Sequence, residues 1–563
     1  MRKNLKIGDI LVEEGLITEE QLQNVLRIQK TTYPDKRIGD LLVNLNYITE
    51  EQLTQSLSKR LRVPFISLKS YPIQNEVVNI LDEKIARKYL AIPIGKNGNI
   101  LTIGMNDPLN LYAIEEIRLA TRLEINAVIC TKEDINNVIE RCYSGRQAFV
   151  AAKQLQQEFN TREIINVGAA VDSNGVIENA PVVKMVNSIV EQGVKLGASD
   201  IHIEAGSEMT RVRMRIDGEL QEQMKINRAA HDAIVTRLKI MSNMNIAEKR
   251  APQDGRFELI HNGYQIDVRV SVLPTTYGEK VVIRILNTQD NAVATVKELG
   301  LTAHNKSLFD KIVKSPNGII LVTGPTGSGK STTLYAVLSE RNKTTDNIIT
   351  LEDPVEKKLE GINQVQINNK AGLTFASGLR SILRQDPDVI MLGEIRDAET
   401  ASIAIRAAIT GHLVFSTLHT NDAASTIVRL VDMGIEPYMV SSALVGVIAQ
   451  RLARKVCPYC KKPHESTQEE MDLLKLGEPV TFYRGEGCQY CNFTGYKGRT
   501  AVHEIIVVNS EIKQMINRGA KAEEIREYAQ AHDTMLLQDN MRQLVLEGIT
   551  TPEEYVKITY SID

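Results

Sequence analysis

Residues 324–332 form the stretch most clearly able to do chemistry. Its members are, in order, Gly324, Pro325, Thr326, Gly327, Ser328, Gly329, Lys330, Ser331 and Thr332. This order fits G-x-x-x-x-G-K-[ST], the pattern of a loop that cradles phosphate groups with inward-turned backbone N–H groups. Lys330 is then expected to reach the β and γ oxygens of ATP, and Ser331 to ligate Mg²⁺. An apolar stretch at 318–323 and a helix-compatible one at 331–338 supply the strand and the helix that such a loop joins.

Two more strand-like stretches, 348–356 and 389–394, end in acidic residues. Ligands of α/β sheets bind beyond the carboxyl ends of the strands, so these acids are expected at the same edge as the phosphate loop. Glu356 should then face the γ-phosphate, and Glu394 should hold Mg²⁺ directly or through water. The residues alone leave a second interpretation open, in which each acid is a solvated charge at the end of a strand.

A third stretch of this kind, 411–420, has a histidine near each end, His412 and His419. A lone histidine is more often a hydrogen-bonded core residue than a catalytic one. The pattern by itself leaves both roles open.

Four of the six cysteines form two C-x-x-C pairs: Cys457, Cys460, Cys488 and Cys491. Two such pairs suit tetrahedral Zn²⁺, although the stretch between them, 461–487, is longer than the usual spacing of about 15 to 20 residues. Four protein ligands leave no open position for a substrate, so the expected zinc is structural. A pair of redox dithiols is the rival interpretation, and Cys130 and Cys142 are expected to be plain core thiols.

Composition narrows the class of protein. The chain has 563 residues, a net charge of −3 and no Trp, which argues against a basic or aromatic nucleic-acid surface. The first residues lack the apolar run of a signal peptide, and no stretch of about 18 uncharged apolar residues occurs. We therefore expect a cytoplasmic protein that does not span a membrane and whose partners are proteins rather than nucleic acid.

An internal repeat opens the chain. Residues 6–11 recur as 37–42, and residues 17–22 recur as 48–53. Each copy has a Thr three residues before a Gln, the spacing of a helix capping box. These pairs are Thr18 with Gln21 and Thr49 with Gln52. Each copy is therefore predicted to be a small helical hairpin.

The remaining patterns predict a multidomain α/β protein. The expected parts are a helical repeat over 1–62, a small α+β subdomain over 63–143, a linker over 144–179, a second α+β domain over 180–290, and a RecA-like domain over 291–563 with a cysteine insert at 457–491 and a helical C-terminal tail. Alternation of strands and helices around the phosphate loop is the basis for the parallel sheet of the RecA-like domain.

These motifs together resemble the secretion ATPase superfamily of type II secretion and type IV pilus systems, most closely its pilus-assembly members. The resemblance covers essentially the whole chain. The matching stretches are 350–356 (the Asp box), 386–397 (the atypical Walker B motif), 411–420 (the His box), the tetracysteine insert and, in the PAS-like N2 domain that precedes the core, 198–204, 249–256 and 269–284.

The resemblance implies a role for each site residue. Glu356 takes the place of the catalytic glutamate, Glu394 that of the Walker B carboxylate, and His419 that of the His-box sensor. The arginines that the family's N2 domain brings to the nucleotide correspond to Arg256, Arg269 and Arg284.

The resemblance also implies how the protein works. The expected assembly is a homohexamer at the inner face of the cytoplasmic membrane, where ATP hydrolysis drives an inner-membrane platform protein and other pilus-machine components. The family's retraction ATPases generally lack both the large N-terminal region and the cysteine insert, which favours pilus extension. A type II secretion ATPase is the nearest alternative. A nucleic-acid translocase and a scaffold without turnover are more remote, because the charge is near neutral and both Glu356 and Glu394 are present.

The N-terminal repeat is similar to the cyclic-di-GMP-binding module of some pilus and secretion ATPases. The residues that carry the likeness are Lys6, Ile7, Gly8, Arg37, Ile38, Gly39 and Asp40. The second copy departs from the module's pattern, with Asn46 at a glycine position and Arg60 at a glutamine position. Asn tolerates the left-handed conformation, so we expect the turn to survive. A purely structural repeat and a dock for a membrane partner remain the alternatives to a dinucleotide site.

Overall fold

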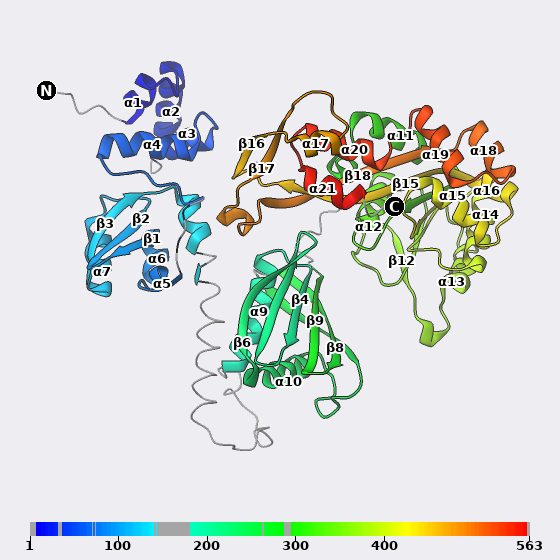
Figure 1. Cartoon of the computed structure of the whole chain (residues 1–563), viewed down its shortest axis with the longest axis horizontal. Coiled ribbons are helices and arrows are strands. Elements are labelled where there is room, and N and C mark those ends of the chain that lie inside the picture. Colours follow the sequence, from blue (N-terminus) through cyan, green and yellow to red (C-terminus); the bar gives the residue numbers. More distant parts are fainter. Residues whose placement is uncertain are drawn as a thin grey trace. The chain divides into compact units, whose positions relative to one another are not determined.

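The computed structural model describes residues 7–31, 37–69, 71, 73, 75–139, 142–143, 181–261, 264–286 and 294–559. The linker expected at 144–179 and Lys6 lie outside the described residues. Figure 1 labels the helices and strands of these residues.

The repeat folds as two helical hairpins. The first consists of α1 (Ile7–Glu13) and α2 (Glu19–Thr31), and the second of α3 (Ile38–Asn44) and α4 (Glu50–Leu61). Both predicted capping boxes are confirmed: Thr18 and Gln21 bond each other's backbone N–H groups, as do Thr49 and Gln52. Local sequence therefore determines where α2 and α4 begin.

Glycines at equivalent positions let the helices of each hairpin approach closely. A Cβ on Gly8 would lie 2.5 Å from Leu22 Cδ1, and one on Gly39 would lie 2.9 Å from Leu53 Cδ2. The left-handed turn expected at Asn46 is also confirmed. Gly15 has φ 69°, and Asn46, at the equivalent position of the second copy, has φ 57°. The repeat thus has a packing reason for its glycines.

The following subdomain is a three-stranded sheet with the order β1-β2-β3. Its elements are α5 (Asn75–Val78), α6 (Glu83–Tyr89), β1 (Ala91–Asn97), β2 (Ile100–Met105), α7 (Leu111–Thr121) and β3 (Glu124–Ile129). Strands β1 and β2 pair antiparallel, and β2 and β3 pair parallel. Cys130 is fully buried beside them, and burial raises the pKa of its thiol to about 12, as expected for a core thiol.

A six-stranded antiparallel sheet with the order β6-β5-β4-β9-β8-β7 follows in the chain. Its strands are β4 (Asp200–Ala205), β5 (Met209–Ile216), β6 (Glu219–Asn227), β7 (Gln253–His261), β8 (Tyr264–Thr275) and β9 (Gly278–Leu286), accompanied by α9 (Pro181–Lys195) and α10 (His231–Met241). Alternate residues such as Ile201, Ile203 and Ile283 are buried, and most of the residues that alternate with them are polar, among them His202, Glu204 and Arg284. The sheet therefore has one apolar face and one mainly polar face.

The phosphate loop belongs to a seven-stranded sheet with the order β12-β11-β13-β14-β10-β15-β18. Its strands are β10 (Gly318–Thr323), β11 (Ile348–Glu352), β12 (Asn363–Gln366), β13 (Val389–Leu392), β14 (Leu413–Leu418), β15 (Leu444–Val456) and β18 (Tyr496–Val507). All neighbouring pairs are parallel except β15 and β18, which are antiparallel.

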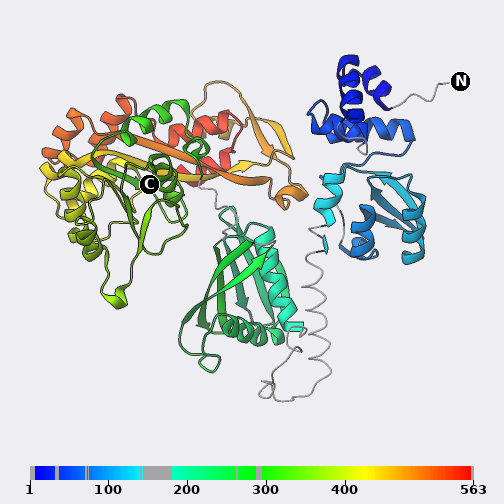
Figure 2. The same cartoon turned by 180° about the vertical axis from the view of Figure 1, so that it is seen from behind.

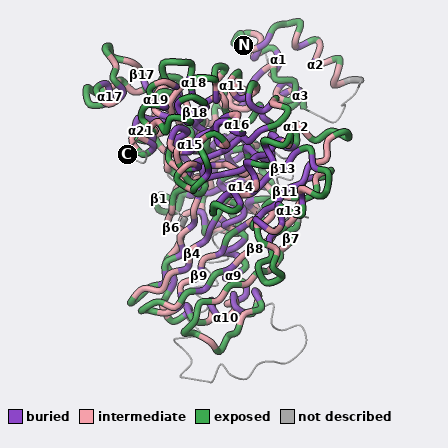
Figure 3. The backbone as a smooth tube through the Cα atoms, turned by 90° about the vertical axis from the view of Figure 1, so that its right-hand side faces the viewer, coloured by how far each residue is buried: buried purple, intermediate pink, exposed green. Residues whose placement is uncertain are grey.

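Helices bury both faces of this sheet, which explains why its strands read as continuous apolar runs. On β10, Ile320 and Val322 pack with α11 (Ala303–Val313) and α12 (Lys330–Arg341), whereas Ile319 and Leu321 pack on the opposite side. The helices of that opposite side are α13 (Phe375–Ile382), α14 (Ala398–Ile409), α15 (Ala423–Asp432) and α16 (Pro437–Ala443), visible in Figures 1 and 2. In Figure 3 the buried residues gather along these strands.

The cysteine insert leaves the sheet at the end of β15 and returns at the start of β18. It contains β16 (Lys461–Glu465), α17 (Gln468–Leu473) and β17 (Thr481–Gly485). The expected helical tail forms only after β18, as α18 (Ser510–Asn517), α19 (Ala522–Ala531), α20 (Leu537–Leu546) and α21 (Pro552–Thr559). Strand β18 was not predicted from the sequence, because its antiparallel partner β15 lies on the other side of the insert.

Candidate functional site

The phosphate loop and the predicted acids lie at one edge of the seven-stranded sheet. Strands β11, β13, β14 and β10 are consecutive neighbours and run parallel, so their carboxyl ends meet there. The loop follows β10, His419 follows β14, Glu394 follows β13, and Glu356 comes four residues after β11. The loop, Glu356 and Glu394 thus follow the carboxyl ends of neighbouring parallel strands, as expected, and His419 follows a fourth strand of the same set.

The phosphate loop has the backbone that its glycines permit. Gly327 and Gly329 have φ of 81° and 87°, in the region that residues with a Cβ rarely adopt. Helix α12 begins at Lys330, whose Nζ donates to the carbonyls of Gly324 and Pro325 at 2.9 and 3.0 Å. Burial lowers the pKa of the Lys330 ammonium, and the carboxylate of Glu394 opposes that effect. The loop thus holds a cation beside a helix N-terminus, which suits a phosphate chain.

Glu356 lies beside the loop's serine. The Ser331 hydroxyl donates to Glu356 Oε1 at 3.2 Å, and the Tyr335 hydroxyl accepts a hydrogen bond from the Glu356 backbone N–H at 3.2 Å. Tyr335 donates in turn to Glu352, whose carboxylate is buried. A carboxylate that is itself exposed and anchored through its backbone is suited to orienting a water molecule next to bound phosphate.

Glu394 is the centre of a second cluster. His419 Nε2 lies 3.2 Å from Glu394 Oε2, and the Arg396 guanidinium bonds the other oxygen. Burial alone would raise the pKa of Glu394, but Arg396 and His419 outweigh it and hold the pKa below its usual value. The carboxylate is therefore ionised at neutral pH, the form that a Mg²⁺ site requires. His412, by contrast, bonds the Ala407 carbonyl at 3.0 Å and has a structural role.

The three arginines expected at the nucleotide form one row on the six-stranded sheet. Arg256 on β7 is directly opposite Arg269 on β8, which is directly opposite Arg284 on β9. Arg284 Nε pairs with Asp200 Oδ1 at 3.0 Å. Like charges placed opposite one another destabilise a sheet, so an anion near the row would stabilise it. The row lies in a different sheet from the phosphate loop.

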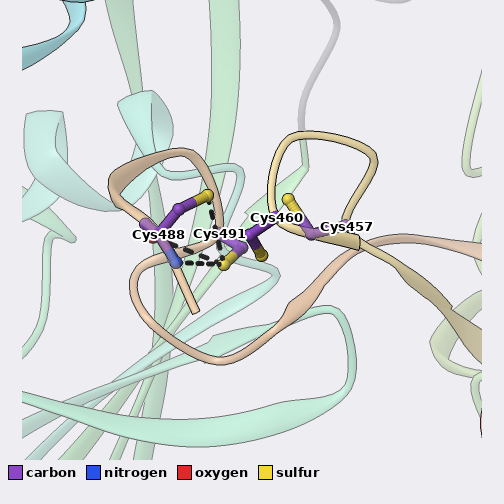
Figure 4. Close-up of side chains that lie close together, drawn as sticks. All are labelled: Cys457, Cys460, Cys488 and Cys491. Carbon is purple, nitrogen blue, oxygen red and sulfur yellow. Dashed lines mark hydrogen bonds between the residues drawn. The ribbon is translucent and has the colours of Figure 1, made fainter. Parts of the chain in front are cut away.

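The four insert cysteines converge, two from each of two turns (Figure 4). Their sulfur atoms all lie within 4.8 Å of one another, and Cys488 Sγ is 3.7 Å from Cys491 Sγ. A tetrahedron with Zn–S bonds of about 2.3 Å has sulfur–sulfur edges of about 3.8 Å. The donor set and its spacing therefore fit Zn²⁺, with no fifth position for a substrate.

The N-terminal motif residues lie at the start of α1 and α3. Ile7 and Gly8 belong to α1, and Ile38, Gly39 and Asp40 to α3. Arg37 directly precedes α3, and its exposed side chain pairs with Asp107 at 3.6 Å. Because so exposed a pair adds little to stability, the Arg37 guanidinium is available to an anionic ligand.

Sequence reasoning missed several residues that hold this site. Tyr335 and Arg396 bond the two acids as described, and Gln450 and Arg451 on β15 contact the phosphate loop. Gln450 and Arg451 had a visible signal, because they are the two polar residues that interrupt an apolar run from 444 to 453. Tyr335 had none, since a tyrosine in a helix is usually part of the core.

Comparison with known proteins supplies a family. Residues 176–557 match the family described as type II/IV secretion system protein, and residues 61–148 match the MshEN domain. The type IV pilus assembly ATPase PilB of Myxococcus xanthus is 41% identical over 562 residues, which are 98% of this chain and 98% of that protein. The type II secretion system ATPase E of Vibrio cholerae is 42% identical over 460 residues, covering 80% of this chain and 91% of that protein.

Solved structures support the fold. The Legionella pneumophila ATPase DotB superimposes with a TM-score of 0.51 at 21% identity, and the match covers 71% of this chain and 100% of that one. Among the residues that the structure describes, none of the helices has the length and apolar character needed to cross a membrane.

Proposed function

The chain belongs to the type II/IV secretion system family and is an ATP-hydrolysing enzyme, and we propose that it drives type IV pilus assembly. The observation that carries the proposal is the end-to-end match to a pilus assembly ATPase, which covers 98% of both chains. The type II secretion relative matches 80% of this chain, so the N-terminal region favours the pilus system. A type II secretion ATPase remains the second candidate, because the Vibrio cholerae type II secretion ATPase is 42% identical over 460 residues.

The site suggests how its residues divide the work. Lys330 and the loop N–H groups would bind the triphosphate, Ser331 and Glu394 would hold Mg²⁺, and Glu356 would orient the attacking water. Bound Mg²⁺ neutralises charge on the β and γ phosphate oxygens. His419, bonded to Glu394, would couple the occupancy of the site to the following α15.

We further propose a homohexamer in which the arginine row reaches the nucleotide. Arg256, Arg269 and Arg284 place three positive charges on one sheet face, which matches the charge that develops on the phosphoryl oxygens. Opening and closing of this sheet against the nucleotide would move an inner-membrane platform protein. The protein would act in the cytoplasm, at the inner face of the membrane.

Deleting the gene is expected to remove surface pili from the organism that encodes this chain. Wild-type protein should restore them, and Lys330→Ala should not, because the loop then lacks the cation that binds the phosphates. Electron microscopy of the cells measures this, and Lys343→Ala, an exposed lysine beyond α12, is the matched control. Normal pili together with loss of a secreted enzyme would assign the protein to type II secretion instead.

We also propose that the N-terminal repeat binds cyclic-di-GMP. The dinucleotide is two-fold symmetric and doubly charged, and the repeat offers two similar half-sites with Arg37 available at one of them. Arg37→Ala should weaken binding about tenfold or more while ATP turnover without the dinucleotide stays unchanged. Isothermal titration with cyclic-di-GMP measures this. Arg118→Ala, which changes an exposed arginine of α7, is the control and should bind cyclic-di-GMP with wild-type affinity. Equal affinity of Arg37→Ala and wild type would show that Arg37 is not part of a cyclic-di-GMP site.

A further inference from the structure

The end of strand β15 lies directly against the phosphate loop. Strand β15 pairs in parallel with β10 up to Thr323 and Ala449, so the next residue, Gln450, is level with Gly324, the first residue of the loop. Gln450 is only 2% exposed. A polar side chain buried at this position needs hydrogen-bond partners, and the loop supplies them.

The Gln450 amide joins the loop to the helix that follows it. Its Nε2 donates to the Ser328 carbonyl at 2.8 Å, and its Oε1 accepts from the Thr333 hydroxyl at 2.7 Å. A carbonyl only accepts, so these partners define which end of the amide faces which group. One side chain therefore links the backbone of the loop to the first turn of α12.

Two loop glycines lie in contact with Gln450. A Cβ on Gly324 would lie 2.3 Å from the Gln450 carbonyl oxygen, and one on Gly329 would lie 2.8 Å from Gln450 Nε2. The two glycines that begin and end the loop therefore lie directly on β15. Gln450 supports the loop along its length rather than at a single point.

The neighbouring residue reaches the other side of the site. Arg451 is 4% exposed, and its guanidinium donates to the Asn421 carbonyl at 2.7 Å. Asn421 lies two residues after His419, in the loop that leads to α15. Consecutive residues of β15 thus hold the phosphate loop and the His419 loop.

We propose that Gln450 is a positioning residue for ATP hydrolysis, because it holds the phosphate loop in its nucleotide-binding conformation. Arg451, the next residue of β15, holds the loop that follows His419, so the same strand fixes both loops. The inference deepens the assigned ATPase activity and does not depend on whether the motor serves pili or secretion. A loop that must reorganise before each binding event would bind nucleotide more weakly, because the ordering cost is then subtracted from the binding free energy.

Gln450→Leu tests this, because it keeps the side-chain size and removes both hydrogen bonds. We expect the Kd for a fluorescent ADP analogue with Mg²⁺, and the KM for ATP, to rise about tenfold or more. Gln450→Glu keeps an acceptor for Thr333 but places a carboxylate oxygen against the Ser328 carbonyl, so it should bind more weakly still. Asn540→Leu is the matched control, since it removes an equally buried amide elsewhere in the fold. The Asn540 side-chain oxygen accepts a hydrogen bond from the backbone N–H of His503.

Thermal melting separates positioning from simple packing. Gln450→Leu and Asn540→Leu should both lower the melting temperature, but only Gln450→Leu should change nucleotide affinity. Unchanged Kd and KM in Gln450→Leu would overturn the proposal.

Thr333→Val provides a milder variant if Gln450→Leu does not fold. It removes one of the two bonds at constant volume and should raise the Kd about threefold. When Gln450→Leu does fold, its effect and that of Thr333→Val should not add fully in a double-mutant cycle, because both substitutions remove the bond between Thr333 and Gln450. No change in Thr333→Val, or full additivity, would also refute the proposal.

Discussion

Replacing Glu356 with Gln is expected to lower kcat for ATP hydrolysis by about 10² to 10⁴-fold while leaving nucleotide affinity nearly unchanged. Glutamine keeps the size of the side chain and an oxygen acceptor for the Ser331 hydroxyl, but it carries no charge with which to polarise a water molecule. Steady-state phosphate release measures kcat, and equilibrium binding of a fluorescent ATP analogue measures affinity. A loss confined to kcat would identify Glu356 as acting in the transition state.

The control for this variant is Glu360→Gln, an exposed glutamate four residues further along the same loop. It should hydrolyse ATP at the wild-type rate. Turnover of Glu356→Gln within about threefold of wild type would transfer the role to Glu394, the other carboxylate at this edge of the sheet. Glu394 is already paired with Arg396 and His419, which makes it better suited to metal binding than to proton transfer.

Removing zinc should have the largest effect on stability. The purified chain is expected to carry one zinc per protomer by elemental analysis, and Cys488→Ser should reduce that content severely. Structural zinc contributes about 10 to 16 kcal/mol of apparent binding free energy in small zinc-finger peptides, so the insert should unfold without it. Increased proteolysis within 457–495 would report the unfolding.

Cys142→Ser is the matched control, because it makes the same substitution outside the cluster and should retain one zinc. The rival dithiol interpretation makes the opposite forecast. It expects no zinc in the wild-type protein and a loss of titratable thiols on mild oxidation, and that pair of results would exclude the metal site.

Sequence patterns predicted most reliably what depends on neighbours along the chain. The capping boxes of Thr18 and Thr49 and the left-handed Asn46 involve residues only a few positions apart, and all three are confirmed. The strand ends that carry Glu356 and Glu394 were also predictable, since parallel strands must present their carboxyl ends at one edge. The catalytic roles of these residues and the domain boundaries stay predictions.

The features that could not be predicted from the sequence depend on partners that are far apart in the chain. Gln450 bonds Ser328 only because β15 pairs with β10, and the arginine row exists only through the register of β7, β8 and β9. Strand β18 was missed for the same reason. None of these pairings has a local signature, because cross-strand register follows from the completed sheet rather than from any one segment.

The return of the chain through β18 has an implication for how such a motor is built. Val456 and Tyr496, the last paired residues on either side of the insert, are direct partners in an antiparallel ladder. The cysteine insert therefore begins and ends at paired residues of two neighbouring strands. A short hairpin turn could connect these strands equally well. The pairing of β15 with β18 therefore does not depend on the length of the insert, so related motors can differ in this segment and keep the same seven-stranded sheet.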